Sequence, residues 1–240
     1  EKMDKQRHLS AVKKAMIAMT PLLLIGSFCL IPAAIPNMIG ETNPISVWIL
    51  NNTQYFDLAY NVSMGLMSVF VSVVTAYHLA KSYELDAPGS MSMALVAFLL
   101  LGMEMDEAGG IALRGMGSKG LFVAMVASLL AVEVYRWCKK RHFTIKMPDT
   151  VPDFISSSFE IIPVTAIVIG LFLGIRVLCQ GVFGIMPNEI FSIILAPLVG
   201  SMDSPLAVTF YHILRCFIFF FGIHPSVLSP IVQPISTQFL

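Results

Sequence analysis

Long stretches without a charged side chain constrain the fold of this chain more than any other feature. Residues 15–40 and 58–80 contain no Asp, Glu, Lys or Arg, and each is long enough to cross a bilayer as a helix. Of the 240 residues, 56% are hydrophobic and 12% are charged, which is about half the charged share of a soluble domain. The solvent for most side chains is therefore lipid, and the sequence predicts an integral membrane protein.

Six apolar segments are candidates for transmembrane helices, because lipid offers a bare backbone no hydrogen-bond partner. They cover residues 15–35, 58–80, 88–103, 120–135, 160–178 and 205–222. The segment 187–205 is apolar but too short and too broken by Pro197 and Gly200 to span. It is expected to lie along the membrane or re-enter it. The predicted fold class is all-α, a polytopic membrane protein with about six transmembrane helices and one amphipathic or re-entrant segment.

Proline and glycine clusters predict where the spans end. "IPAAIPN" at 31–37 is expected to close the first span, and "ELDAPGS" at 84–90 to open the third. "GMGSKG" at 115–120 is expected to turn into the fourth span, since it lacks the spacing of a phosphate loop. The stretch 41–57 is predicted to be an outer loop, whose Trp48 and Tyr55 suit a membrane interface.

The distribution of basic residues predicts the orientation. Five Lys or Arg precede the first span, one lies between the second and third, and five follow the fourth, which makes 11 on one side. The loops on the other side contain only Arg114 and Lys119. Because cytoplasmic loops are enriched in basic residues, the N-terminus is predicted to be cytoplasmic.

Several classes of site are not indicated. The four cysteines have no CxxC spacing, so neither a zinc site nor a disulfide framework is expected. No paired catalytic carboxylates, Ser/His/Asp set or nucleic-acid patch is seen, and the formal net charge is zero. We expect no catalytic residue, no metal, no cofactor, no nucleic-acid partner and no cleavable signal peptide.

The candidate site lies near the end of the chain. His212, Arg215, Phe219 and Gly222 share one face of the sixth predicted helix, and His224 follows in "FFGIHPS". Arg215 faces a polar site, fixes helices by binding backbone carbonyls, or snorkels to the membrane surface. Phe219 either packs or contacts substrate. His224 is placed where Pro225 stops a helix, so its imidazole either binds the hydroxyl of a neutral solute or is a core histidine satisfied by a neighbour.

Five stretches in order resemble one family, the IIC sugar permeases of the bacterial phosphotransferase system, in the lactose, cellobiose and N,N'-diacetylchitobiose group. They are "HLSAVKKAMIAMTPLLLIGSFCLI", "MGLMSVFVSVVTAYHLAKSYELD", "GSKGLFVAMVASLLAVEVYRW", "MPDTVPDFISSSFEIIP" and "FIFFFGIHPSVLSPIVQP". The last is similar to the family's substrate-region motif, Leu-Phe-Trp-Phe-Phe-Gly-Ile-His-Gly. Phe219 stands here at the motif tryptophan, and Pro225 at the final glycine.

The resemblance implies a division of the chain and a set of partners. Residues 1–180 would be an N-terminal transmembrane dimerisation bundle, and 181–240 the start of a substrate-binding transport domain that continues beyond Leu240. The family's homodimers sit in the bacterial cell membrane and move a disaccharide inward. A phosphocysteine on the separate IIB component, supplied in turn by IIA, phosphorylates the sugar, so the IIC chain carries no phosphate. The motif histidine contacts the sugar, a role that falls on His224, with Phe219 and Arg215 beside it.

The predicted function is a permease for a β-linked disaccharide of the cellobiose, diacetylchitobiose or lactose type. Such a chain is the translocating subunit of a sugar phosphotransferase, and whether it counts as an enzyme by itself stays open. One alternative is a dimer-forming interaction module, or half of a split permease, without transport of its own. Another is an unrelated secondary transporter, which would show ion-dependent uptake and an unphosphorylated product.

Overall fold

The computed structural model describes residues 6–105, 111–112, 115–143 and 159–190, with single or short groups of positions at 145, 148, 152, 156, 193, 209, 212–213 and 215–217. Its α-helices are α1 (Arg7–Phe28), α2 (Ile31–Ile39), α3 (Pro44–Asn51), α4 (Thr53–Ser63), α5 (Met67–Ser82), α6 (Ala87–Gly102), α7 (Leu121–Lys140) and α9 (Ile162–Leu178). The other elements are a two-residue antiparallel pair, β1 (Glu104–Met105) and β2 (Ile111–Ala112), a 3₁₀ turn at Ser118–Gly120, and a π-helical turn at Cys179–Phe183.

The helical fold class is confirmed. Among the described residues, four helical units are long and apolar enough to cross a membrane, namely Arg7–Ile39, Thr53–Ser82, Ser118–Lys140 and Ile162–Phe183. The predicted third span is the helix α6, whose 16 residues are fewer than the roughly 20 that a perpendicular crossing needs. Most of the predicted sixth span, 205–222, and most of 187–205 lie outside the described residues, so a count of six spans is not established.

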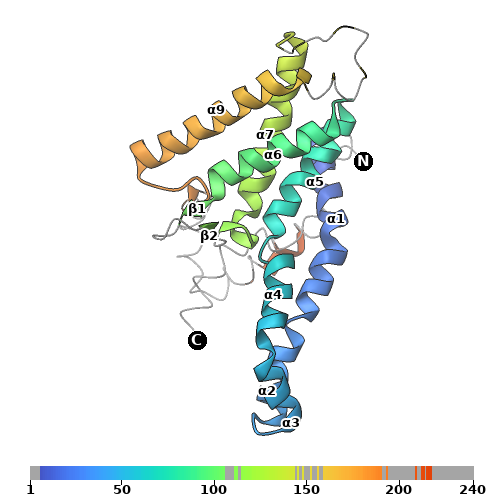
Figure 1. The fold of residues 1–240 in the computed structure, drawn as a ribbon, viewed down its shortest axis with the longest axis vertical. Helices are drawn as coiled ribbons and strands as arrows, with labels where there is room; N and C mark the ends of the chain where they lie inside the picture. Colours follow the sequence, from blue (N-terminus) through green and yellow to red (C-terminus); the bar gives the residue numbers. More distant parts are fainter. Residues whose placement is uncertain are drawn as a thin grey trace.

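A bundle of α5, α6 and α7 forms the centre of the molecule, with α1 against α5 and α9 against α6 (Figure 1). Small side chains lie where these helices meet: Ala76, Ala97, Ala124 and Ala131 are all fully buried. Small residues allow helix axes to approach closely, which is how helices associate when lipid surrounds them. The core is thus built by close contact of backbones as much as by large side chains.

The prediction of a loop at 41–57 is wrong. Helices α2, α3 and α4 form an arm with the far end of α1, and this arm extends away from α6, α7 and α9 (Figure 1). Pro32 and Pro44 sit in the first turn of α2 and α3, where a proline fits because no backbone donor is needed there. Asn43 caps α3 by accepting a hydrogen bond from the Ile45 amide at 3.0 Å. The prolines therefore start helices here and do not end the first span.

The start of α6 follows the sequence prediction. Asp86 is the N-cap, and its Oδ2 accepts a hydrogen bond from the Gly89 amide at 2.7 Å. Pro88 stands in the first turn, which requires no backbone donor from it. An aspartate cap followed by proline is a local signal, so it could be recognised without knowledge of the packing.

Gly26 is expected to be indispensable to the crossing of α1 and α4. A Cβ atom added at Gly26 would meet Ser63 Cβ at 2.9 Å, and the Ser63 hydroxyl would be closer still. Gly26→Ala should therefore lower the free energy of unfolding by about 1–3 kcal/mol, the usual cost of overpacking. The measurement is the thermal unfolding midpoint of the detergent-solubilised protein.

Gly170→Ala is the matched control for this prediction. An added Cβ at Gly170, in the middle of α9, has no atom within 4 Å. The higher helix propensity of alanine should raise stability there by up to about 1 kcal/mol. Equal effects of the two substitutions would show that the α1–α4 contact does not depend on glycine.

Candidate functional site

The structure tests the predicted sugar site only in part. Arg215 has a helical conformation and an exposed side chain, whereas Phe219 and His224 lie outside the described residues. The described residues therefore do not bring the three predicted site residues together, and their common site stays a prediction. What the structure does place in detail are two polar contacts at opposite ends of the bundle and one apolar groove.

Arg176 joins α9 to the end of α6. Its Nη1 donates to the backbone carbonyl oxygens of Leu100, at 2.9 Å, and Met103, at 2.8 Å. Both carbonyls belong to the C-terminal turn of α6, where no further helical amide is available to them. A guanidinium with fixed donors satisfies them, and its positive charge is favourable at a helix C-terminus. Arg176 thus has the structural role that the sequence analysis considered for Arg215.

Glu133 lies at the centre of a second polar contact, at the end of the bundle where α1 begins and α7 ends. We call the group of Arg7, His8, Tyr83, Glu133 and Arg136 the Glu133 cluster. The carboxylate accepts hydrogen bonds from the Tyr83 hydroxyl at 2.6 Å and from Arg136 Nη1 at 3.3 Å. His8 Nε2 lies 2.9 Å from the same carboxylate. One side chain of α7 therefore holds the start of α1 and the end of α5.

Two guanidinium groups flank the Tyr83 ring. The Cζ atoms of Arg136 and Arg7 lie 4.0 Å and 5.0 Å from the ring centroid, within the range of a cation–π contact. Burial raises the pKa of the Tyr83 hydroxyl, and its hydrogen bond to Glu133 raises the pKa further. The hydroxyl is therefore a stable proton donor at neutral pH. Its partners are charges of both signs, with the Glu133 carboxylate on the hydroxyl and two guanidinium groups beside the ring.

The Glu133 cluster was not predicted from the sequence, although the sequence contains a signal for it. Glu133 falls within the segment 120–135 that was predicted as an apolar span. An ionisable residue inside such a segment is costly unless it is paired, so it should prompt a search for partners. The partners come from positions 125 and 50 residues away in the chain, and helix periodicity could not identify them.

Removal of the Glu133 carboxylate is expected to loosen this end of the bundle. Glu133→Ala leaves Tyr83 and His8 without their shared acceptor, and we expect a loss of about 1–2 kcal/mol, because the ion pairs are about one-third exposed. The thermal unfolding midpoint measures this loss. Glu41→Ala, at an exposed carboxylate in the arm, is the control and should have little effect. An equally small decrease of the unfolding midpoint in both variants would show that Glu133 does not stabilise the contact of α1, α5 and α7.

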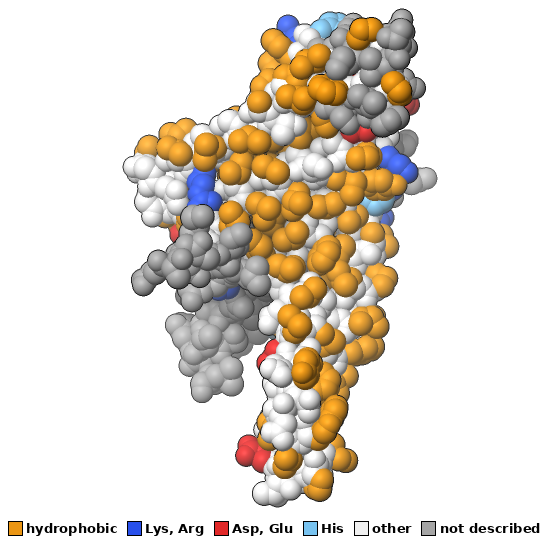
Figure 2. Space-filling model, viewed as in Figure 1, with side chains coloured by type: hydrophobic (Ala, Val, Ile, Leu, Met, Phe, Trp, Pro, Cys, Tyr) orange, Lys and Arg blue, Asp and Glu red, His pale blue; other side chains and the backbone are white. Residues whose placement is uncertain are grey.

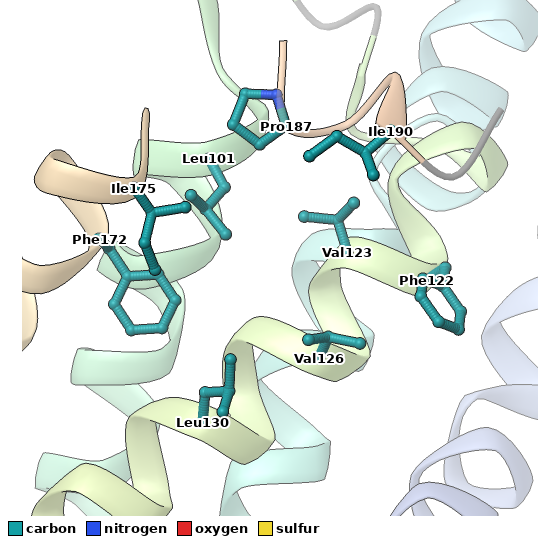
Figure 3. Close-up of a pocket in the computed structure, with 9 residues that line it drawn as sticks. All are labelled: Leu101, Phe122, Val123, Val126, Leu130, Phe172, Ile175, Pro187 and Ile190. Carbon is teal, nitrogen blue, oxygen red and sulfur yellow. The ribbon is translucent and has the colours of Figure 1, made fainter. Parts of the chain in front are cut away.

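An apolar groove opens between α7 and α9 (Figure 3). Its volume is about 210 Å³, and every lining side chain is apolar. The walls are formed mainly by Phe122, Val123, Val126 and Leu130 of α7 and by Phe172 and Ile175 of α9. A disaccharide needs several hydrogen-bond partners, and this lining supplies none. The groove is therefore not a sugar site.

Within the described part of the chain, no group of three or more His, Cys, Asp or Glu could hold a metal ion.

The packed apolar helices define a polytopic helical membrane protein. Residues 13–240 match the family described as "Phosphotransferase system, EIIC". The chain therefore belongs to this family of integral membrane proteins.

Three similar proteins illustrate the relationship. The chain is 32% identical to the lactose-specific EIICB component of Lactococcus lactis subsp. lactis, over 98% of this chain and 42% of that protein. It is 32% identical to the oligo-beta-mannoside-specific EIIC component of Bacillus subtilis strain 168, over 98% of this chain and 54% of that protein. The crystal structure of ChbC, the IIC component from the N,N'-diacetylchitobiose-specific phosphotransferase system, matches with a TM-score of 0.72 and 27% identity, over 96% of this chain and 57% of that one. The chain thus spans about half the length of these relatives.

Proposed function

We propose that this chain forms part of a phosphotransferase-system permease that takes up a β-linked disaccharide and delivers it for phosphorylation. The observation that carries the proposal is the family match over residues 13–240. The names of the similar proteins specify lactose, oligo-beta-mannosides and N,N'-diacetylchitobiose, all of which are β-linked sugars. The shared linkage supports a substrate of this class, and it does not select one sugar.

A IIB component is the proposed phosphate donor, with IIA behind it. The name EIICB of the lactose-specific relatives combines IIC and IIB, which supports such a partner. In this chain, Cys138 is fully buried on α7, so its thiol is not accessible to another protein. The phosphate-carrying group is therefore proposed to lie on the partner.

The proposed sugar contacts are His224, Phe219 and Arg215. An imidazole can donate and accept a hydrogen bond, an aromatic ring can cover the apolar face of a sugar, and a guanidinium can donate to hydroxyl oxygens. The apolar lining of the groove beside α7 supports a site elsewhere, beyond α9. Residues 181–240 are proposed as the start of the transport domain to which that site belongs.

The orientation proposed is with the N-terminus in the cytoplasm. Arg7, Lys81, Arg136 and Lys139 lie at the ends of α1, α5 and α7, which meet at one end of the bundle (Figure 1). This clustering of basic residues supports the assignment of that end to the cytoplasmic side.

Residues 1–180 are proposed to form the dimerisation bundle of a homodimer. The arm supports this, because Met38, Trp48 and Tyr55 are 81%, 60% and 62% exposed, and hydrophobic side chains cover much of the visible face (Figure 2). A single cysteine at Met38, in a protein without its native cysteines, should crosslink two copies in the membrane. A chain that stays monomeric under crosslinking at Met38 and at Trp48 would argue against a dimer through the arm.

The experiment that tests the proposed function is uptake of labelled β-disaccharides into cells that produce the full-length permease with or without its IIB component. We expect sugar phosphate to accumulate only when IIB is present. Ion-dependent accumulation of unphosphorylated sugar would instead support a secondary transporter. Stable assembly without uptake of any β-disaccharide would favour an interaction module.

A further inference from the structure

We propose that the groove between α7 and α9 binds one acyl chain of an anionic phospholipid, whose headgroup pairs with Lys119. The proposal depends on the groove and on the membrane location of the chain, and it is independent of which sugar is carried. Its first basis is the shape of the groove (Figure 3). Phe172 and Leu101 are buried, at 0% and 6% exposure, and form the floor, whereas Val126 and Leu130 are 38% and 46% exposed on the wall. The groove thus has one buried side and one side whose residues are partly exposed.

The second basis is the chemistry of the lining. Helices α7 and α9 both belong to units that are long and apolar enough to cross a membrane, and the partly exposed lining side chains Val126 and Leu130 are apolar, which fits hydrocarbon at the open side of the groove. A peptide or sugar would leave its polar groups without hydrogen bonds there, at high cost. An acyl chain has no such groups and can bend to fill an irregular channel. The lining therefore fits a lipid tail better than any polar ligand.

The third basis is charge at the end of the groove where α7 begins. Lys119 has an exposed side chain in the turn before α7. It lies in the 3₁₀ turn Ser118–Gly120, directly before α7, three and four residues before Phe122 and Val123, which line the groove. Three other charged groups near this end are already engaged. Backbone carbonyls hold Arg176, the Asn188 amide donates to Glu104 at 3.3 Å, and the Met186 amide donates to Glu189 at 3.1 Å. Lys119 is thus the cation best placed to meet a lipid phosphate or glycerol-phosphate headgroup.

The tail and the headgroup are expected to contribute differently, so the site should select lipids by their headgroup. Lipid tails are as apolar as leucine, so filling the groove distinguishes poorly between one lipid tail and another. One Lys near the membrane surface favours an anionic lipid by about five-fold over a neutral one. We therefore expect a preference for phosphatidylglycerol over phosphatidylcholine with identical tails, and we expect the preference to depend on Lys119.

The test is native mass spectrometry of the full-length protein, extracted in mild detergent and equilibrated with equal amounts of these two lipids. Wild type should retain phosphatidylglycerol about five-fold more than phosphatidylcholine, and Lys119→Glu should abolish this preference. Leu130→Trp, which fills the groove, should reduce retention of both lipids.

Leu171→Trp is the matched control, because Leu171 is 43% exposed on α9 and does not line the groove. It should leave lipid retention unchanged, and circular dichroism should show that all variants keep their helical content. Equal retention of the two lipids by wild type, or an equal loss in Leu130→Trp and Leu171→Trp, would overturn the proposal. Retention that responds to Leu130→Trp but not to Lys119→Glu would overturn its assignment of the headgroup.

Discussion

Uptake of β-disaccharide by the full-length permease is expected to fall about ten- to hundred-fold in His224→Ala, while the protein still inserts into the membrane. Truncation of the imidazole would leave a sugar hydroxyl without its hydrogen-bond partner, and an unsatisfied buried polar group costs about 1–3 kcal/mol. The measurement is the initial rate of phosphorylation-coupled uptake in cells that contain the IIB component, corrected for the amount of permease in the membrane.

Two further variants make this prediction specific. His224→Gln should retain part of the activity, because the amide can both donate and accept a hydrogen bond. His78→Ala removes a half-buried histidine of α5, in the N-terminal bundle, and should leave the uptake rate near that of wild type. Unchanged uptake in His224→Ala, or an equal loss in His78→Ala, would remove His224 from the sugar site.

Local signals in the sequence predicted the membrane class and the start of α6. The charge-free runs identify the spans because burial in lipid requires apolar side chains at nearly every position. Asp86 and Pro88 identify a helix start because a cap and a first-turn proline act within a few residues. Both inferences depend only on neighbours in the chain, so the three-dimensional packing was not needed.

The extent of the arm was not predicted, because a proline can either end a helix or stand in the first turn of one. Pro32 and Pro44 resemble helix terminators when read as breakers, yet each occupies the first turn of a helix. For Pro44, an N-cap residue directly before the proline marks a helix start. Asn43 is such a cap, with its Oδ1 on the Ile45 amide, and it could have indicated α3 from the sequence. The orientation of α2 and α4 beside α1 depends on contacts such as Gly26 against Ser63, which the sequence does not specify.

The hydrogen-bond partners of Arg176 also could not be predicted from the sequence. The sequence placed Arg176 at or inside the fifth span, and the cost of a buried guanidinium predicts that it has partners. It could not identify them, because backbone carbonyls occur at every position and leave no mark in the sequence. The acceptors on Leu100 and Met103 lie more than 70 residues earlier in the chain. A search for an acidic partner would therefore have failed.

Arg176→Met is expected to destabilise the protein strongly, because it removes the guanidinium group from the junction of α9 with α6. Methionine retains the apolar stem but has no donor, so the carbonyls of Leu100 and Met103 would lose their shared partner. Hydrogen bonds to a charged group contribute about 1.5–3 kcal/mol each, and lipid cannot replace them. We expect a loss of about 2–4 kcal/mol, measured as a decrease of the thermal unfolding midpoint by roughly 5–10 °C.

Arg141→Met is the control. It makes the same change of side chain at an exposed position just after α7. If that variant lowered the midpoint as much as Arg176→Met, the loss would reflect charge and not the junction of α9 with α6. A charge effect and a broken junction should also affect different parts of the protein. If the junction is broken, the last amides of α6 should exchange hydrogen faster, because Arg176 no longer binds the carbonyls at the end of that helix. A general charge effect should leave the hydrogen exchange of α6 unchanged. The last turn of α6 is therefore where the role of Arg176 can be measured directly.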